Sequence, residues 1–417
     1  MHLHRLRYNV VYPLNFRRWG QKETYLQLGN ACENNGQYQK AIQHYQKAQS
    51  IALESGDKCH EGRAYQRLGD AYWKICEYQT SIDYYQKALN IALERRDKWQ
   101  EGQAALGLGN AYVYIGQYQT AIEHYQKTLN IALERRYKWQ EGEAYRGLGY
   151  AYVNIGRYQT SIELYQKALN IALDRKDKLQ EGQAYRGLGS AYVNIGQYQT
   201  SNEHYQKALN IALERRDKWL EGEAYRGLGC AYVNIGHYQT SIEHYEKALN
   251  IAQEGRDKWQ EGQAYLGLGE AYVNIGQYQT SIEHCQKALN IALERKDKWQ
   301  EGQASLGLGD AYVYIDQYQT SIEHYQKALN ISLDRKDKLQ EGRAYRGLGD
   351  VYQNLCESEK AIEYYRKVKD LALEREEKME DGDVLLKLRY GLLNPRQKVA
   401  EERNDKGEAC MHEYIPS

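Results

Sequence analysis

Residues 101–140 read EGQAALGLGN AYVYIGQYQT AIEHYQKTLN IALERRYKWQ, and the chain repeats this stretch with small changes along most of its length. The period is 40 residues without a gap, and nine units together span residues 21–380. The units begin at Gln21, Glu61, Glu101, Glu141, Glu181, Glu221, Glu261, Glu301 and Glu341. A fixed period of about 20–50 residues is typical of arrays in which each unit packs only on its neighbours. The sequence therefore predicts a repeat solenoid.

Each unit contains two apolar patterns with helical spacing. In the quoted unit Leu108, Ala111 and Ile115 share one face of a first helix, which we call helix A. Ile122 and Leu129 lie on one face of a second helix, helix B. One such hairpin cannot bury both apolar faces alone, so neighbouring units must stack. The predicted fold is all-α, a solenoid of antiparallel helix pairs.

Cap signals agree with these boundaries. Asp97 followed by Gln100 predicts an N-cap and a capping box at the start of helix A. The N-cap aspartate recurs as Asp177, Asp217, Asp257, Asp297 and Asp337. A left-handed end of helix A is predicted at Gly116, Gly156, Gly196, Gly236 and Gly276. Glycines inside helix A, at Gly69, Gly109 and Gly149, are expected to let stacked helices approach closely.

Large aromatic residues recur in the first turn of helix A. They are Trp99, Trp139, Trp219, Trp259 and Trp299. Because periodic apolar positions usually pack against the next unit, we interpret these tryptophans as packing residues and not as ligand platforms.

The two ends of the chain differ from the repeats. Residues 1–20 are basic and contain no acid, and we expect a flexible N-terminal segment, with a targeting peptide as the alternative. Residues 381–394 are predicted to form a capping helix that ends near Pro395, and residues 395–417 a polar tail. Seven cysteines without a CxxC pair indicate free thiols, and no long apolar run suggests a membrane helix. We therefore expect a cytoplasmic protein.

The second unit carries the residues of a known pattern, namely Tyr65, Leu68, Gly69, Tyr72, Tyr78, Ser81, Tyr85 and Ala88. On these residues the chain resembles the tetratricopeptide repeat superfamily, which implies a right-handed superhelical solenoid. The forty-residue form, with GLGNAY and ALNIALERRD, is similar to the Pins/LGN G-protein-signalling modulators and to tetratricopeptide repeat protein 28. Those relatives imply a scaffold in intracellular signalling or in cytoskeletal and cortical organisation. Gly107 departs from the first of them, which has asparagine there, and no GoLoco-like or CHAT-like segment follows.

The resemblance places helix A on a concave face, where one set of side chains forms a register of donors. Arginines at Arg146, Arg186 and Arg226 accompany asparagines at Asn154, Asn194 and Asn234. Because arginine binds carboxylates through a fork and asparagine binds backbone amides, we predict that this groove binds extended, acidic peptide segments of other proteins. The alternative is that Arg186 only pairs with a neighbouring glutamate such as Glu143 or Glu223.

The position after each Leu-Gly pair varies while the core residues barely change. It reads Asn30, Asp70, Asn110, Tyr150, Ser190, Cys230, Glu270, Asp310 and Asp350. We interpret it as free of packing constraint, which adds Asn110, Tyr150 and Ser190 to the candidate peptide-binding residues. The alternative is that these positions are merely exposed.

Catalysis is not predicted. The chain has no phosphate-binding GxxxxGK[ST] motif, and an open groove offers little burial to separate the pKa values of a carboxylate pair. Histidines recur at one position of helix B, as His44, His124, His204, His244, His284 and His324, too far apart to share zinc, so we expect no metal, cofactor or enzymatic activity. Equal numbers of acidic and basic residues, 56 of each, argue against nucleic acid and membrane partners. An architectural spacer or a self-associating array, with no groove ligand, remains the alternative to a scaffold.

Overall fold

The computed structural model describes residues 11–374, with side chains from residue 20 to residue 372. Over this part of the chain the secondary structure is 18 α-helices, and no strand is present. The helices are α1 (Val11–Asn34), α2 (Tyr38–Glu54), α3 (Lys58–Lys74), α4 (Tyr78–Glu94), α5 (Lys98–Tyr114), α6 (Tyr118–Arg135), α7 (Lys138–Asn154), α8 (Tyr158–Arg175), α9 (Lys178–Asn194), α10 (Tyr198–Arg215), α11 (Lys218–Asn234), α12 (Tyr238–Glu254), α13 (Lys258–Asn274), α14 (Tyr278–Arg295), α15 (Lys298–Val313), α16 (Tyr318–Arg335), α17 (Lys338–Asn354) and α18 (Ser358–Glu374). Odd-numbered helices are the A helices and even-numbered helices are the B helices.

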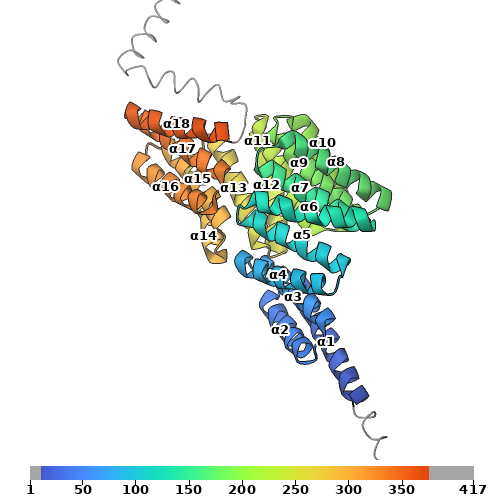
Figure 1. Cartoon of the computed structure of the whole chain (residues 1–417). Coiled ribbons are helices and arrows are strands. Elements are labelled where there is room, and N and C mark those ends of the chain that lie inside the picture. The colour runs from blue at the N-terminus through green and yellow to red at the C-terminus, as the bar shows by residue number, and fades with distance from the viewer. Residues whose placement is uncertain (1–10, 375–417) are drawn as a thin grey trace, which may run out of the picture. The chain divides into compact units, whose positions relative to one another are not determined.

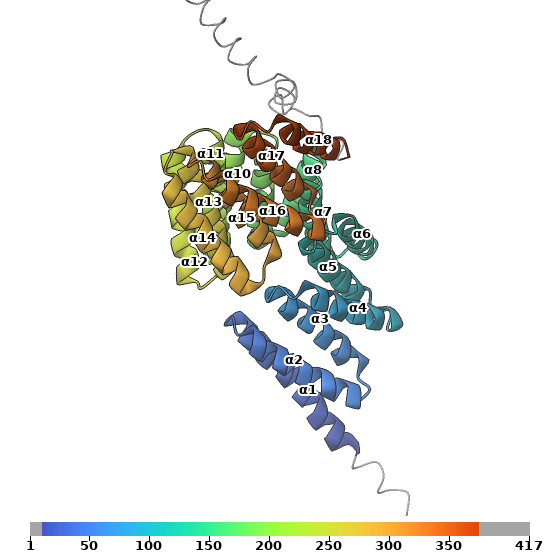
Figure 2. The same ribbon diagram turned by 90° about the vertical axis from the view of Figure 1, so that its left-hand side faces the viewer.

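The described helices form two compact units. The first contains α1 to α11, where each helix packs antiparallel against the next and successive A helices such as α3, α5 and α7 also touch (Figure 1). The second contains α13 to α18 and most of α12, and there α15 to α18 pack in the same order, with α13 against α15 (Figure 2). The predicted all-α solenoid of antiparallel helix pairs is confirmed within each unit.

The N-terminal boundary differs from the sequence prediction. Helix α1 begins at Val11, so residues 11–20, which we expected to be flexible, continue the first A helix. Pro13 does not prevent this, because the N–H groups in the first turn of a helix have no intrahelical acceptor to lose. The predicted capping helix at 381–394 and the tail at 395–417 lie outside the described residues.

Five of the six predicted aspartate caps are confirmed, at Asp97, Asp177, Asp217, Asp257 and Asp337. The Asp97 side chain accepts a hydrogen bond from the Gln100 N–H at 3.1 Å, and α9, α11, α13 and α17 are capped in the same way. The glutamine at the third position of helix A contacts the preceding unit. Gln180, which follows the cap Asp177, donates through Nε2 to the Trp139 carbonyl at 3.1 Å, and Gln140, which follows Tyr137, donates to the Trp99 carbonyl at 2.9 Å. Gly102 makes room for it, since a Cβ there would lie 2.5 Å from Gln140 Oε1. The expected turn at Gly116 has φ 78°.

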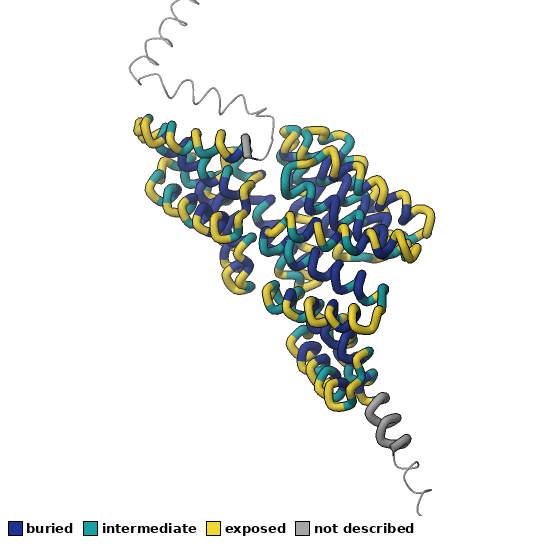
Figure 3. Tube along the Cα trace, in the orientation of Figure 1, coloured by how far each residue is buried: buried dark blue, intermediate teal, exposed yellow. Residues whose placement is uncertain are grey.

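The Gly-Leu-Gly triplet of helix A accommodates a buried tyrosine on each side. A Cβ at Gly109 would lie 2.6 Å from the ring of Tyr125, which belongs to the same repeat, and a Cβ at Gly147 would lie 2.5 Å from that same ring. Gly107 relates to Tyr85 in the same way, at 2.5 Å. Each ring therefore lies between the A helix of its own repeat and the A helix of the next. The buried residues follow the helix sides turned to neighbours (Figure 3), and Tyr125 is only 1% exposed.

One B helix contains a polar residue at a core position. Asn202 of α10 stands where Ile162 and Ile242 are buried in neighbouring repeats, and its Oδ1 is buried without a hydrogen-bond partner. Because an unsatisfied buried amide costs about 1–3 kcal/mol, Asn202→Ile is expected to raise the free energy of unfolding by that order. Thermal unfolding followed by circular dichroism measures the change, and Asn210→Ile, at an exposed position of the same helix, is the control. A fall in melting temperature for Asn202→Ile would contradict this account.

Candidate functional site

The buried tyrosines place their hydroxyl groups at the variable position of helix A. Tyr85 donates to Asp70 Oδ1 at 2.8 Å, and Tyr125 donates to Asn110 Oδ1 at 2.8 Å. Equivalent bonds join the pairs Tyr45 and Asn30, Tyr325 and Asp310, and Tyr365 and Asp350. Our interpretation that this position is free of packing constraint is therefore wrong where it is Asn or Asp. It supplies the acceptor for a hydroxyl whose ring is buried.

The three predicted arginines all contact buried glutamates. Arg146 donates through Nε to both oxygens of Glu143, at 3.3 and 3.2 Å. Arg186 Nη1 donates to Glu223 Oε2 at 3.2 Å, and Arg226 donates to both oxygens of Glu223 at 3.0 Å. The pair of Arg186 and Glu223 is the one that the sequence offered as the alternative to ligand binding. The guanidinium of Arg186 also lies 5.5 Å from the ring centroid of Trp219.

Glu223 shares its charge between two arginines. It is 1% exposed, whereas the Arg186 and Arg226 side chains are 17% and 30% exposed. Burial alone raises the pKa of Glu223, but the two guanidinium groups outweigh burial and lower it. Because one carboxylate faces two guanidinium groups, a positive charge remains at this point of the helix A surface.

The predicted asparagines use their donors within their own helices. Asn154 Nδ2 donates to the Tyr150 carbonyl at 2.8 Å, and Asn194 Nδ2 donates to the Ser190 carbonyl at 2.8 Å. Asn234 makes the same bond to residue 230. A peptide on this surface would therefore meet the amide oxygens, which accept hydrogen bonds from backbone N–H groups.

A cavity of about 890 Å³ lies in the first unit, on the A helices of three successive repeats. Residues of α3, α5 and α7 form most of its lining, and four of the lining side chains are cationic. They are Arg63, Arg67, Lys138 and Arg175, with exposed side-chain fractions between 35% and 57%. Their carboxylate neighbours are less exposed, at 8% for Glu141 and 29% for Asp70. The lining therefore presents mainly N–H donors to anything that enters.

Aromatic rings form another part of this lining. The Trp99 ring centroid lies 5.2 Å from that of Tyr137 and 6.3 Å from that of Trp139. Trp99 therefore packs against the next repeat, as we predicted, and 43% of the residue also stays exposed in the cavity lining. The sequence contains a signal that we did not use: Arg67 and Tyr137 replace the glycine and the aspartate of most other repeats.

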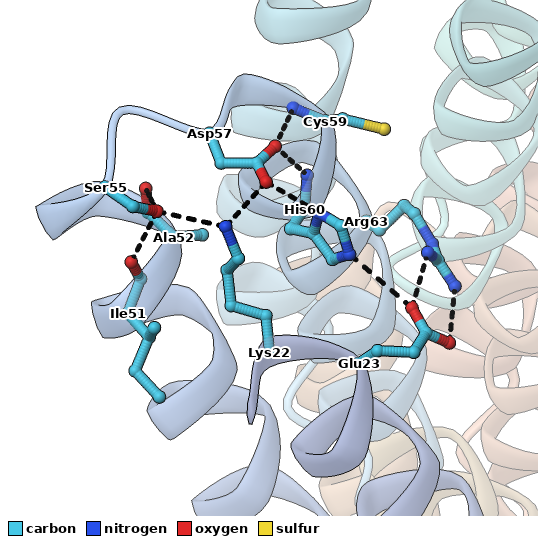
Figure 4. A network of polar contacts seen from close by, with 9 residues as sticks. All are labelled: Lys22, Glu23, Ile51, Ala52, Ser55, Asp57, Cys59, His60 and Arg63. Carbon is cyan, nitrogen blue, oxygen red and sulfur yellow. Dashed lines mark hydrogen bonds and ion pairs between the residues drawn. The ribbon is translucent and has the colours of Figure 1, made fainter. Parts of the chain in front are cut away.

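A polar network joins α1 and α3 (Figure 4), and one of its members, Arg63, also lines the cavity. Lys22 is 3% exposed, and its Nζ donates to Asp57 Oδ2 at 2.6 Å and to Ser55 Oγ at 3.1 Å. His60 Nδ1 lies 2.9 Å from the same Asp57 oxygen. His60 Nε2 lies 3.5 Å from Glu23 Oε2, and Glu23 in turn binds a cavity residue, Arg63. This network occurs at the first repeat, where Lys22 replaces the glycine of the later ones.

The recurring histidines stack on tyrosines instead of meeting one another. Tyr112 and His124 have ring centroids 5.3 Å apart, and Tyr192 and His204 are 5.2 Å apart. No group of three or more His, Cys, Asp or Glu residues in residues 11–374 is arranged to hold a metal ion. Within residues 11–374 none of the helices has both the length and the apolar composition that a membrane span requires.

Because of these histidines, we expect the free energy of unfolding to fall in acid. Burial first, then the lysine three residues further on, lowers the pKa of His124, His204, His244, His284 and His324. The unfolded chain therefore binds protons more readily, and stability present above about pH 6.5 is expected to fall as the pH is lowered. Because Tyr84 and Tyr364 occupy the same position in other repeats, His→Tyr substitutions at the five positions should reduce this fall.

Melting temperatures between pH 7.5 and 5 measure the effect. The control is His237→Gln, which exchanges an exposed histidine for the residue found at Gln197 in the repeat before. An unchanged acid dependence in the fivefold His→Tyr variant would contradict the assignment.

The sequence matches a known protein family over most of its length. The sequence pattern described as "Tetratricopeptide repeat" matches residues 22–94, 77–134, 100–174, 140–214, 180–254, 260–334 and 300–374. No curated protein matches the chain. The narrower similarity to the Pins/LGN modulators and to tetratricopeptide repeat protein 28 therefore stays a prediction.

Solved structures show the same fold at low sequence identity. A Rap protein complexed with competence and sporulation factor has a TM-score of 0.66 at 15% identity, and the match covers 86% of this chain and 98% of that one. The Rap conjugation gene regulator of plasmid pLS20, in complex with the Phr* peptide, has a TM-score of 0.57 at 14% identity, covering 86% and 97%. Apo NprR, a quorum sensor from B. thuringiensis, has a TM-score of 0.55 at 15% identity, covering 86% and 99%. At these identities the likeness shows the fold alone.

Proposed function

We propose, from the premise that the chain belongs to the tetratricopeptide repeat family, that it is a protein-interaction scaffold binding extended, acidic peptide segments on its A helices. The observation that carries the proposal is the cavity in the first unit. Most of its lining comes from the A helices of three successive repeats, with Ala88 of α4 and Arg175 of α8 added, and an extended peptide would follow this surface. Two of the similar structures are complexes with a peptide or factor, which supports this choice of ligand.

The acidic character of the ligand follows from the exposed N–H donors of the lining. Arg67, with 47% of its side chain exposed, has only a 3.5 Å contact to Asp70. A ligand carboxylate that reaches two such guanidinium groups forms charge-assisted hydrogen bonds, which are about twice as strong as neutral ones. The exposed face of Trp99 offers apolar contact beside these charges.

The residues first predicted from the sequence extend the proposed surface beyond the cavity. They are Arg146, Arg186, Arg226, Asn154, Asn194, Asn234, Asn110, Tyr150 and Ser190. A cytoplasmic, non-enzymatic role in signalling or in cortical and cytoskeletal organisation, which the narrower resemblance implies, belongs to the same proposal. Nucleic acid and membrane lipid are not proposed as partners, because the chain carries no net charge.

Fluorescence anisotropy with labelled peptides tests the function. Three twelve-residue peptide pools, rich in Asp and Glu, in Lys and Arg, or in neutral polar residues, are titrated with the full chain. The acidic pool is expected to bind most tightly, and Arg67→Glu with Arg175→Glu is expected to raise its Kd about 10-fold, with weaker binding at higher salt. The matched control is Arg135→Glu with Arg215→Glu, which reverses two exposed charges at the repeat position of Arg175 outside the cavity.

Charge reversal is unsuitable at the predicted arginine register, because it would place a carboxylate against the buried Glu143 or Glu223. Arg186→Gln is the appropriate variant there, with folding verified by circular dichroism. Equal binding of all three pools, or none, would contradict the proposal. Concentration-dependent association in sedimentation experiments, together with no peptide binding, would favour the self-associating array instead.

A further inference from the structure

One cation of the cavity is held by a carboxylate from a different repeat. Arg63 of α3 donates through Nη1 to Glu23 Oε2 at 2.9 Å and through Nη2 to Glu23 Oε1 at 3.4 Å (Figure 4). Glu23 lies on α1, 40 residues earlier, and does not line the cavity, whereas Arg63 does. The guanidinium therefore binds both oxygens of a carboxylate, in the way it would bind an acidic ligand.

The other cations of the lining lack such a partner. Lys138 pairs with Glu141 on its own helix, Arg175 lies 3.7 Å from Asp177 at the adjoining turn, and Arg67 lies near Asp70 on its own helix. Each of those three carboxylates belongs to the same helix as its cation or to the turn next to it. Only the pair of Arg63 and Glu23, among these four contacts, joins two successive A helices.

The chain itself contains a neutral version of this contact. Arg343 of α17 occupies the repeat position of Arg63, and its Nη1 donates to Gln303 Oε1 at 3.0 Å. Gln303 occupies the repeat position of Glu23. An amide therefore accepts a hydrogen bond from the arginine at this repeat position at 3.0 Å, while the carboxylates of Glu270 and Asp310 also attract the charge of Arg343. A glutamine side chain thus fits at the repeat position of Glu23.

We propose that Glu23 is an internal competitor of the acidic ligand for Arg63, and that the ligand binds by displacing the Glu23 carboxylate from the guanidinium. The inference rests on the proposed function and names Arg63 as the carboxylate-binding residue of that site. Displacement is feasible because the pair is accessible: 44% of the Arg63 side chain and 27% of the Glu23 side chain are exposed. An exposed ion pair contributes little to stability, so an incoming carboxylate that replaces it loses little.

The test is the effect of Glu23→Gln on affinity for one probe, a labelled twelve-residue peptide of alternating Glu and Ser with an amidated C-terminus. Glu23→Gln gives Arg63 the partner that Arg343 already has and is expected to lower the Kd of the full chain about 3-fold. Arg63→Gln is expected to raise the Kd, and in the Arg63→Gln background Glu23→Gln should have no further effect. The matched control is Glu33→Gln, which removes one charge from the same helix where the carboxylate accepts from Tyr45. Melting temperatures show whether each variant is folded.

Each outcome supports or overturns the inference. Tighter binding by Glu23→Gln that disappears in the double variant supports it. A Kd that is unchanged or raised by Glu23→Gln, or lowered equally by Glu33→Gln, overturns it and leaves the scaffold function intact if the wild-type chain binds the probe. No binding of the probe by the wild-type chain contradicts the proposed function itself. The same peptide with a free C-terminus distinguishes a terminal carboxylate from side-chain carboxylates.

Discussion

Alanine at Gly147 is expected to lower the free energy of unfolding by about 1–3 kcal/mol, although alanine is the better helix former. The new Cβ would lie 2.5 Å from Cε1 and 2.7 Å from Cδ1 of Tyr125. That ring has little room to move away, because the side chain is 1% exposed and the backbone of Gly109 also lies close to it: a Cβ built on Gly109 would be 2.6 Å from the same Cε1. Urea unfolding measures the loss, and hydrogen exchange in α6 and α7 locates it.

Two variants separate this overpacking from a general effect of Gly→Ala. Gly342→Ala places the same methyl group inside an A helix where the nearest neighbour atom, Cδ1 of Leu371, is 3.9 Å away, and it is expected to gain up to about 1 kcal/mol. Tyr125→Cys copies the residue that the chain has at Cys285. The loss caused by Gly147→Ala should shrink in the Tyr125→Cys background, because the pair in contact is then removed. Equal effects of Gly147→Ala and Gly342→Ala would refute the steric role of the glycine pair.

The fold was predictable because the signals for each helix lie within a single repeat, a few residues apart. The cap at Asp97 and the left-handed turn at Gly116 depend on residues a few positions apart, and both are confirmed. Contacts between repeats were less accessible to sequence reasoning. Gln140 crosses to the Trp99 carbonyl, 41 residues away, and one unit taken alone gives no sign of that acceptor.

The candidate site was only partly predictable, for a related reason. Arg146 and Arg186 were recognised by their register, but their buried partners Glu143 and Glu223 decide how much of each charge a ligand can reach. The cavity was missed because it is built from departures from the repeat, such as Arg67 and Tyr137. Each unusual residue is visible in the sequence. That the unusual residues of different repeats line one cavity depends on how the A helices stack.

Asp57→Asn is expected to destabilise the first repeats by about 3 kcal/mol at pH 7, because it leaves the ammonium group of Lys22 buried without a carboxylate. Lys22 is 3% exposed and lies 2.6 Å from Asp57 Oδ2. Asparagine can still cap α3, where Asp57 accepts from the N–H groups of Cys59 and His60, so the loss reports the charge. This expected loss is at the low end of the roughly 3–5 kcal/mol for breaking a buried ion pair, because 23% of the Asp57 side chain is exposed.

The pH dependence gives an independent check of the same pair. Burial raises the pKa of Asp57, but the bond from Lys22 and the N–H of His60 outweigh burial and lower it to about 2. A depressed pKa means that the carboxylate stabilises the fold above about pH 4 and that this contribution is lost as the pH falls toward 2. The difference between the wild-type chain and Asp57→Asn should therefore shrink over that range, as measured by urea unfolding at each pH.

Two variants serve as controls for Asp57→Asn: the same substitution in a later repeat, and the removal of the charge of Lys22. Asp257 caps α13 with the same two backbone bonds, and the position equivalent to Lys22 is Gly222, so Asp257→Asn is expected to cost less than about 1 kcal/mol. Lys22→Met added to Asp57→Asn should recover most of the loss, because no buried charge then lacks a partner. If the double variant is as unstable as Asp57→Asn, the unpaired lysine is not the cause and the cap geometry of α3 is.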